Sequence, residues 1–303
     1  MAGKKMNVKK SGKDYESVMG FLFRALPLLY RHHAPGSEVY TFLKKVARQE
    51  VEALFSVIKQ EPRSFGPFGK IVFPYYNKMG AVDSLNLFDL DELIIFSFCW
   101  ANRKRYRYVM DIGANIGLHS IILDRCGFNV RAYEPDPTHF KILRRNLKLN
   151  RCHAVEPSNA AISNRNGTME FIRVLGNTTG SHLVGSKARP YGKLERLPVR
   201  VEDIKSLITR ADLVKIDAEG HEKEILLATD RNHWQNTDGL VEIENRRNAA
   251  VVYRHLKNLG VNLFSQKTNW QRVLRVDDIP TSYREGTLFV TCKNEMPWKN
   301  ESF

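Results

Sequence analysis

A short segment in the second quarter of the chain has the composition of a ligand-binding turn. Asp111-Ile-Gly-Ala-Asn-Ile-Gly117 follows an apolar strand-like run and precedes a helical pattern that begins at Leu118. Gly113 allows the chain to turn close to a ligand, and Gly117 allows a helix to begin beside it. The free amides at a helix N-terminus attract a carboxylate, and Asp111 at the strand's end could hold an ammonium group. The turn therefore predicts a ligand that carries an amino acid.

The spacing of the two glycines distinguishes this turn from a dinucleotide site. Dinucleotide sites follow Gly-x-Gly-x-x-Gly, and the middle glycine admits the pyrophosphate. Here the spacing is Gly-x-x-x-Gly, with Ala114 and Asn115 between the glycines. Fewer glycines suffice for a ligand made of one amino acid and one nucleoside. We expect Ala114 and Asn115 to line its site.

An acidic residue ends the next strand-like segment, Val130–Tyr133. Glu134 comes 21 residues after Gly113, close to the separation at which an acid meets a ribose diol in such folds. A carboxylate accepts hydrogen bonds from both hydroxyls, although any single glutamate could simply lie on the surface. The turn and Glu134 together indicate S-adenosylmethionine, with Pro135 and Asp136 as further contacts.

The adenine of that cofactor is expected after the following helix. The segment 159–163 contains Ala160 and Ala161, whose small side chains would suit a flat base. As a lone signal this pattern has low specificity.

Titratable side chains gather at the end of another predicted strand, Leu213–Asp217. In a strand Lys215, Asp217 and Glu219 would face the same side. A buried lysine needs an acidic partner, and Asp217 or Glu242 could serve. We therefore expect Lys215 and Asp217 at the reacting end of the site.

Three roles are open to Asp217. It could contact the cofactor's amino end or the methyl acceptor, remove a proton from a hydroxyl acceptor, or bind a metal with Glu219 or Glu242. Magnesium prefers one or two carboxylates plus waters, but these acids could equally form a closed polar network with Lys215. A divalent metal is possible and not favoured.

Histidines offer a second kind of base. His221 follows the acidic strand end and is the leading candidate, with His119 and His182 as alternatives; a histidine at such a place often only caps or packs. The polar segment Asn177–Leu183 could cover the cofactor or contact the acceptor, or it could be a solvated hairpin loop.

From Tyr106 onward the hydrophobic pattern alternates between strands and helices, which is typical of a parallel sheet covered on both faces. Helices are expected from about Leu118, Thr138, Glu222 and Arg247. The predicted strands are Tyr108–Ile112, Val130–Tyr133, the region 160–162, Leu213–Asp217, 240–243, 261–264 and 288–292.

The residues before this region have a different pattern. Two helices are expected between Asp14 and about Gln60, separated by Pro35-Gly36 with Ser37 as an N-cap; a short strand over 70–76 and a helix from Leu90 follow. We therefore divide the chain into a flexible basic arm (1–12), a helical extension with a short strand (13–105), a catalytic domain (106–295) and a tail (296–303).

Composition sets limits on the partners. The 303 residues carry 47 basic and 33 acidic side chains, a net charge of +14, which favours an anionic surface or nucleic acid but is also compatible with a solvated surface. No stretch is long enough for a membrane span. The four scattered cysteines read as free thiols in a reducing, cytoplasmic location. The oligomeric state stays open.

Several blocks together resemble one family. These are Asp111–Gly117, Tyr133-Glu-Pro, Asn146-Leu-x-x-Asn150, Lys215-Ile-Asp-Ala-Glu-Gly-His-Glu222 and Val241-Glu-Ile-Glu244. They resemble the FkbM family of methyltransferases over 106–243, with a continuation to Thr291, and the Lys215–Glu222 block is the most specific. The resemblance implies a Rossmann-like class I fold with a seven-stranded, mostly parallel sheet, S-adenosylmethionine as cofactor, and O-methylation of a sugar or natural product. It is silent on the first 60 or so residues.

The leading functional hypothesis is therefore an O-methyltransferase acting on a hydroxyl of a sugar, glycan or other small molecule. The alternative is an RNA 2′-O-methyltransferase, motivated by the positive charge and by Lys215, Asp217 and Glu242. Against it, the basic residues are dispersed, with one dense cluster at 103–107.

Overall fold

The architecture centres on one large sheet in a computed structural model that describes residues 17–56, 60–76, 83–175, 180–187 and 192–298. The strand order is β13-β12-β14-β11-β10-β3-β4-β5. The strands are β3 Tyr108–Ile112, β4 Asn129–Tyr133, β5 Val155–Ser158, β10 Leu213–Ile216, β11 Asp238–Val241, β12 Asn262–Ser265, β13 Gln271–Arg272 and β14 Leu288–Thr291.

Five neighbouring strands of this sheet, from β11 to β5, run parallel, whereas β14, β12 and β13 pair antiparallel. The predicted α/β Rossmann-like fold is confirmed. The expected seven strands are supplemented by the two-residue β13 at the edge. The chain order reverses between β3 and β10, which is where open sheets of this kind bind ligands.

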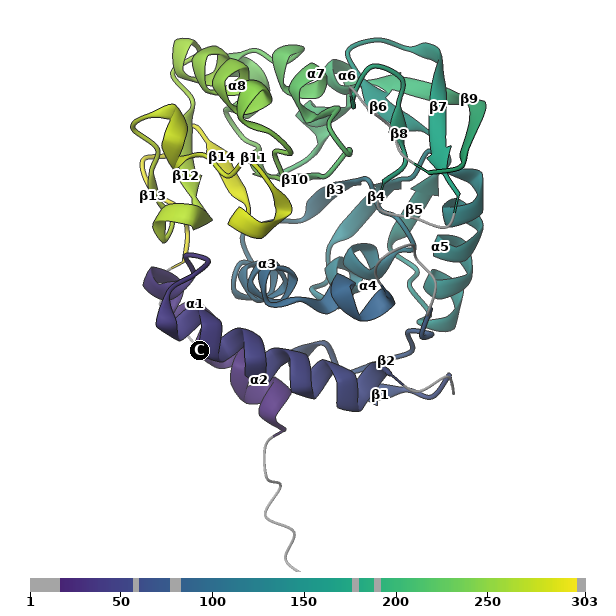
Figure 1. Cartoon of the computed structure of the whole chain (residues 1–303), viewed down its shortest axis with the longest axis vertical. Coiled ribbons are helices and arrows are strands. Elements are labelled where there is room, and N and C mark those ends of the chain that lie inside the picture. Colours follow the sequence, from purple (N-terminus) through teal and green to yellow (C-terminus); the bar gives the residue numbers. More distant parts are fainter. Residues whose placement is uncertain (1–16, 57–59, 77–82, 176–179, 188–191, 299–303) are drawn as a thin grey trace, which may run out of the picture.

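Helices cover both faces of the sheet because side chains alternate along its strands. In β3, Val109 packs with the α1–α5 side, while Met110 and Ile112 pack with the α6–α8 side. Figure 1 shows α3 and α4 on one face, with α7 and α8 on the other. The helices are α1 Val18–Leu28, α2 Glu38–Phe55, α3 Leu90–Ala101, α4 Leu118–Arg125, α5 Pro137–Leu149, α6 Ile204–Leu207, α7 Glu222–Leu227 and α8 Arg246–Asn258.

Short 3-10 turns connect these elements. They are η1 Tyr30–His32, η2 Gly66–Phe68, η3 Ser84–Phe88, η4 Ile208–Arg210, η5 Arg231–Trp234, η6 Gln266–Thr268, η7 Val276–Asp278 and η8 Tyr283–Glu285.

A second, four-stranded sheet stands beside the first (Figure 1). It has the order β6-β9-β7-β8, formed by β6 Ala161–Ser163, β9 Leu194–Asp203, β7 Gly167–Val174 and β8 His182–Leu183. The segment 160–162 was expected in the main sheet and belongs here instead. The main-sheet position is taken by β5, whose Pro157 is tolerated because β5 is an edge strand.

The helical extension packs directly onto the main domain. Ser17 and Ser37 cap α1 and α2 by accepting from the backbone amides of Gly20 and Tyr40, as expected for Ser37. Side chains of α1, α2 and α3 share one core with β3, β4 and α4. A short antiparallel pair of two-residue strands, β1 Arg63–Ser64 and β2 Lys70–Ile71, follows α2.

Specific contacts hold the extension and the C-terminal residues in place. The side-chain amide of Asn150 exchanges hydrogen bonds with both the amide and the carbonyl of Val72, each 2.8 Å. Met296 and Trp298, expected in a C-terminal tail, are buried, and the Trp298 ring makes edge-to-face contacts with His33 and Phe98. The helical extension and the residues after 295 therefore pack against the rest of the described structure.

Two smaller expectations also have outcomes. Within the described ranges, no helix combines the length and apolar character needed to cross a membrane. The cysteines are free thiols, as expected, with Cys99 and Cys126 buried.

Candidate functional site

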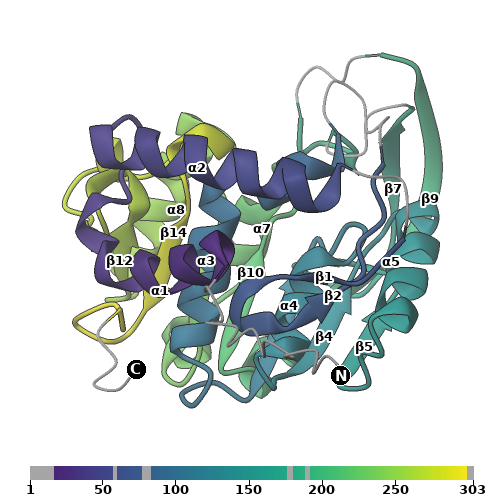
Figure 2. The ribbon, with the colours of Figure 1, turned by 90° about the horizontal axis from the view of Figure 1, so that it is seen from below.

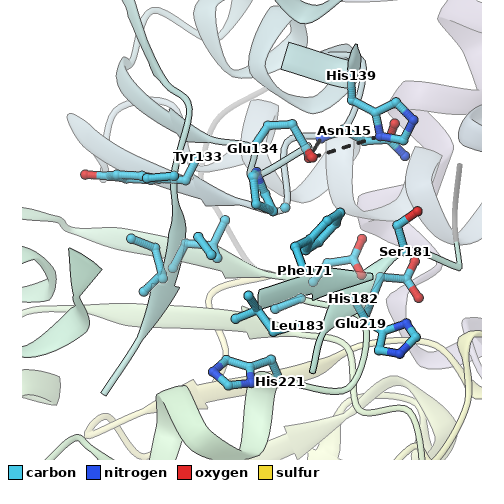
Figure 3. A pocket seen from close by; sticks show the side chains of 18 residues that line it. Asn115, Tyr133, Glu134, His139, Phe171, Ser181, His182, Leu183, Glu219 and His221 are labelled. Carbon is cyan, nitrogen blue, oxygen red and sulfur yellow. Dashed lines mark hydrogen bonds and ion pairs between the residues drawn. The ribbon is translucent and has the colours of Figure 1, made fainter. Parts of the chain in front are cut away.

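A cleft opens at the carboxyl ends of β3, β4 and β10, roofed by the second sheet. In Figure 3, Asn115, Glu134 and His139 lie at one end of it and His221 at the other, with Phe171 and Leu183 between them. The lining residues are Ile112, Gly113, Asn115, Tyr133, Glu134, Pro135, His139, Ala160, Ala161, Ile162, Phe171, Ser181, His182, Leu183, Asp217, Ala218, Glu219 and His221.

The turn after β3 is fixed by backbone contacts. The amides of Gly113 and Ala114 both donate to the carbonyl of Tyr133, each at 3.0 Å. Gly113 has a φ of +77°, and a Cβ atom there would overlap the carbonyl oxygen of Asp217. Only glycine therefore permits this contact between the turn and the end of β10.

Glu134 lies at the end of β4 with only 5% of its surface exposed. Its carboxylate accepts from the amides of Asn115 (2.9 Å) and Asp136 (2.8 Å), and His139 Nδ1 lies 3.9 Å away (Figure 3). Burial raises the pKa of Glu134 to about 8, against the opposing effect of the two amides. A ribose diol that donates to this carboxylate would replace the solvent it has lost.

One part of the cleft is apolar. Ala160 and Ala161 line it together with Phe171 of β7 and Leu183 of β8. Leu183 ends the segment 177–183, which was expected to cover the cofactor or contact the acceptor, whereas Phe171 was not identified from the sequence. The signal for Phe171 is the alternation of apolar and polar residues in 168–174.

Asp111 does not line the cleft. The side-chain alternation of β3 places it on the face that packs against α4, where it accepts from Ser120 Oγ at 2.6 Å and is fully buried. Ala114 and Gly117 also lie outside the lining, and Gly117 begins α4 with a φ of +93°. These three residues therefore support the turn from the side away from the cleft.

Asp136 is likewise directed away from the cleft. Its carboxylate receives two hydrogen bonds from the Arg173 guanidinium, at 2.6 and 2.8 Å, and one from the amide of Thr138. Although burial acts to raise the pKa of Asp136, the Arg173 hydrogen bonds lower it. This residue, expected to contact the cofactor, instead joins α5 to the second sheet.

Lys215 lies within β10, outside the cleft lining, and contacts Asp217 from the side away from the cleft. It is paired in register with Asp111 of β3, and its Nζ lies 3.8 Å from Asp111 Oδ1 and 3.1 Å from Asp217 Oδ2. Burial alone would lower the pKa of Lys215, but Asp217 and Asp111 outweigh it and raise that pKa. Lys215 is therefore a permanent cation that holds Asp217 at the cleft.

The other acids at this edge are neutralised within the protein. Lys187 contacts Glu219 at 2.6 Å and Glu244 at 2.8 Å, while Glu242 lies outside the cleft lining. Burial raises the pKa of both Glu219 and Glu242 well above the usual range, and Asp217 adds to the effect. Within the part of the chain that the structure describes, no group of three or more His, Cys, Asp or Glu could hold a metal ion.

The three candidate histidines differ in the hydrogen-bond partners of their ring nitrogens. His221 meets Ser163 Oγ with Nε2 (2.8 Å) and Ser186 Oγ with Nδ1 (3.1 Å), and burial lowers its pKa to about 4. His119 is hydrogen-bonded to Glu92 at 2.6 Å, outside the cleft lining.

His182 lines the cleft with a different arrangement. Its Nδ1 lies 2.9 Å from the carbonyl of Gly180, whereas its Nε2 is buried and has no partner among the described residues. Burial lowers its pKa. The carbonyl requires a proton on Nδ1, so Nε2 carries a lone pair. Positions 177–179 of the expected covering segment lie outside the described residues.

Glu222 is a structural residue of this edge for which the sequence suggested no role. Its Oε1 accepts from the amides of Ala218 (2.8 Å) and Gly220 (3.0 Å), which fixes the loop that carries Glu219, whose φ is +52°. An acid at the start of a helix, two residues after a glycine, is the signal that could have revealed this role.

Comparison with known proteins defines the class. Residues 111–260 match the methyltransferase FkbM domain. Methyltransferase sdnD of Sordaria araneosa is 27% identical over 206 residues, covering 56% of this chain and 79% of that protein. Methyltransferase 1 of Beauveria bassiana is 22% identical over 187 residues, covering 54% and 75%.

A solved structure, Methyltransferase FkbM from Methylobacillus flagellatus, is 16% identical with a TM-score of 0.36 and covers 61% of this chain and 43% of that chain. The domain match and the two sequence relatives make this protein an S-adenosylmethionine-dependent methyltransferase. Over residues 111–260, just under half of its length, the chain carries the FkbM methyltransferase domain.

Proposed function

We propose that the protein transfers the methyl group of S-adenosylmethionine to a hydroxyl of a sugar, glycan or other small molecule. The observation that supports this most is Asp217, whose carboxylate lines the cleft beside the Gly113 turn while Lys215 holds it from behind. A carboxylate in this position can accept a hydrogen bond from the hydroxyl of the methyl acceptor, and so align the hydroxyl oxygen with the methyl carbon.

The cofactor would lie along the cleft in one direction. Glu134 accepts from the ribose hydroxyls, Ala160 and Ala161 contact the base, and the Gly113 turn faces the methionine end. This order brings the methyl group toward the end of β10. The sulfonium methyl is already activated, so alignment of the acceptor supplies most of the rate enhancement.

The chemical step is a displacement at the methyl carbon. The acceptor oxygen forms a bond to that carbon as the carbon–sulfur bond breaks, and the sulfur leaves as a neutral thioether. The hydroxyl proton passes to a base. Among the histidines His182 is the best placed, since its Nε2 lone pair is unpaired within the described structure, whereas both ring nitrogens of His221 are occupied. We assign His221 a positioning role.

The charge at this edge weighs against RNA as the acceptor. The lysines that the structure describes at this edge are already paired, since Lys187 contacts Glu219 and Glu244 and Lys215 contacts Asp217. They are therefore not available to a phosphodiester chain, which is bound through contacts between phosphates and basic side chains. A neutral, hydroxyl-rich acceptor has no such requirement.

The test is methyl transfer from labelled S-adenosylmethionine to a panel of sugars, glycans, lipids and RNAs. With the acceptor it identifies, Asp217→Asn should lower kcat by about 10²-fold, the cost of misaligning a bound reactant, while S-adenosylhomocysteine still binds. His182→Gln should flatten the acid limb of the pH profile.

Glu156→Gln is the matched control, because this carboxylate is exposed on the edge strand β5 and contributes nothing to the cleft lining. Full activity of Asp217→Asn would exclude Asp217 from the chemistry. Methylation of RNA with no transfer to any sugar or small molecule would refute the proposed acceptor class.

A further inference from the structure

The two helices of the extension form one side of the molecule. Figure 2 shows α1 and α2 side by side on the face turned toward the viewer, with α3 behind them. Each buries a single stripe: Met19, Leu22 and Leu26 in α1, and Leu43 and Val51 in α2. The opposite stripe of each helix therefore faces outward on this side.

That outward face carries large apolar side chains. Phe21 is 60% exposed, Leu28 73% and Phe42 66%. Among the described residues, the one other large hydrophobic side chain that is more than half exposed is Leu274, on a distant loop. Phe21 and Leu28 are seven residues apart and thus lie on the same stripe of α1. Such clustering marks an interaction surface.

Exposed basic residues lie near two of these apolar side chains along the helices. Lys45 is exposed one turn beyond Phe42, and Arg31 follows Leu28. Between Ser17 and Ser56 there are five basic residues and three acidic ones, and residues 1–16 carry five lysines against two acids. Lys44 and Arg48 are paired with Asp89 and Glu52, so the positive charge that this face offers beside its apolar anchors comes from residues such as Arg31 and Lys45.

We propose that the α1–α2 face, defined by Phe21, Leu28, Val39, Phe42 and Lys45, binds the surface of an anionic lipid bilayer. Exposed phenylalanine and leucine enter the boundary between headgroups and acyl chains, while neighbouring lysines and arginines attract acidic headgroups. This inference is independent of the proposed acceptor.

Two other occupants fit the face less well. Nucleic acid is bound through phosphate contacts and base stacking, and the side chain of Leu28 offers neither. The core of a stable interface between protein chains is depleted in charge, with lysine under-represented, whereas Lys45 lies on the same stripe as Val39 and Phe42. A bilayer uses both the apolar and the basic residues.

The experiment is co-sedimentation of the full chain with vesicles of phosphatidylcholine and phosphatidylserine, and with vesicles of phosphatidylcholine alone. We expect binding to the first that weakens as salt is added. The double variant Phe21→Ser/Leu28→Ser should bind about tenfold or more weakly, since it loses two apolar anchors.

Leu274→Ser is the matched control. Leu274 is 75% exposed, and its carbonyl accepts from Tyr253 of α8, on the opposite side of the main sheet (Figure 1). It should bind vesicles like the wild type. Neither α1 nor α2 contributes to the cleft lining, so all variants should keep their affinity for S-adenosylhomocysteine.

Three outcomes would overturn the proposal. They are absence of vesicle binding by the wild type, equal binding by the double variant, and tight binding to single-stranded RNA that does not require Phe21 and Leu28.

Discussion

At the scale of single residues, the buried carboxylate of Glu134 makes stability depend on pH. Its pKa is about 8 in the folded protein, compared with an ordinary value of 4.5. Between these values the folded state retains a proton that the unfolded state has lost, so the free energy of unfolding falls as pH rises. Without cofactor, Glu134→Gln should therefore gain thermal stability relative to the wild type across this range. Melting curves at several pH values would measure this, and an unchanged difference would contradict it.

The same substitution should affect the cofactor in the opposite direction. Since the ribose hydroxyls favour the ionised carboxylate, wild-type affinity for S-adenosylhomocysteine should increase from about pH 6 to about pH 8. Glu134→Gln should bind about tenfold or more weakly, as hydrogen bonds to charged groups contribute about 1.5–3 kcal/mol, and show little pH dependence. Titration calorimetry provides the measurement.

Residue types and spacing were sufficient to predict that Glu134, Gly113, Asn115 and Asp217 surround one cleft. They were insufficient for Asp111 and Asp136, because a strand end or helix start does not reveal which neighbour a side chain will reach. Ser120 and Arg173 hold these two acids, and Arg173 belongs to a sheet whose position could not be inferred from local sequence.

At the scale of elements, the second sheet is fastened to the domain by Arg173 and Asp136. Arg173→Met would leave Asp136 buried without its partner, which we expect to cost about 3 kcal/mol of unfolding free energy. It should also weaken S-adenosylhomocysteine binding, because Phe171 on the same strand roofs the cleft.

Arg196→Met is the control within the same sheet, since Arg196 pairs with Glu170 on an exposed surface. Such a pair contributes about 1 kcal/mol or less. Urea unfolding of both variants decides the issue, and equal losses of stability would show that the Arg173–Asp136 pair has no special role.

Elements with regular apolar periodicity, such as β3, β4, β10 and α2, could be predicted well. The edge strand β5 could not, because Val155-Glu-Pro-Ser158 has neither an apolar run nor clear alternation. The strand β11 begins two residues earlier than expected, at Asp238. Its buried carboxylate accepts hydrogen bonds from Tyr106, Thr291 and Lys293. Such pairing compensates a polar residue in a core strand.

At the scale of the whole molecule, Trp298 links the end of the described chain to its beginning. It is 3% exposed and packs against His33, Phe98 and Trp270. Trp298→Ala should lower the unfolding free energy by about 3–5 kcal/mol. Because α1–α3 share a core with the main sheet, calorimetry should show one transition at a lower temperature.

Trp100→Ala is the comparison for that measurement, as Trp100 is half-buried beneath Arg103 and should cost less. Two separate transitions, with the domain melting as in the wild type, would mean that the extension folds independently. Sequence periodicity predicted the helices of the extension, but their docking depends on contacts between residues more than 200 positions apart, such as His33 with Trp298.

The overlap that any side chain at Gly113 would create with the carbonyl of Asp217 has a consequence for how the enzyme can diversify. The turn after β3 and the loop after β10 touch backbone to backbone, so neither can be lengthened or redirected without displacing the other. The shape of the cleft can therefore be altered more readily through the side chains that β7 and β8 contribute to its lining, which are Phe171, His182 and Leu183.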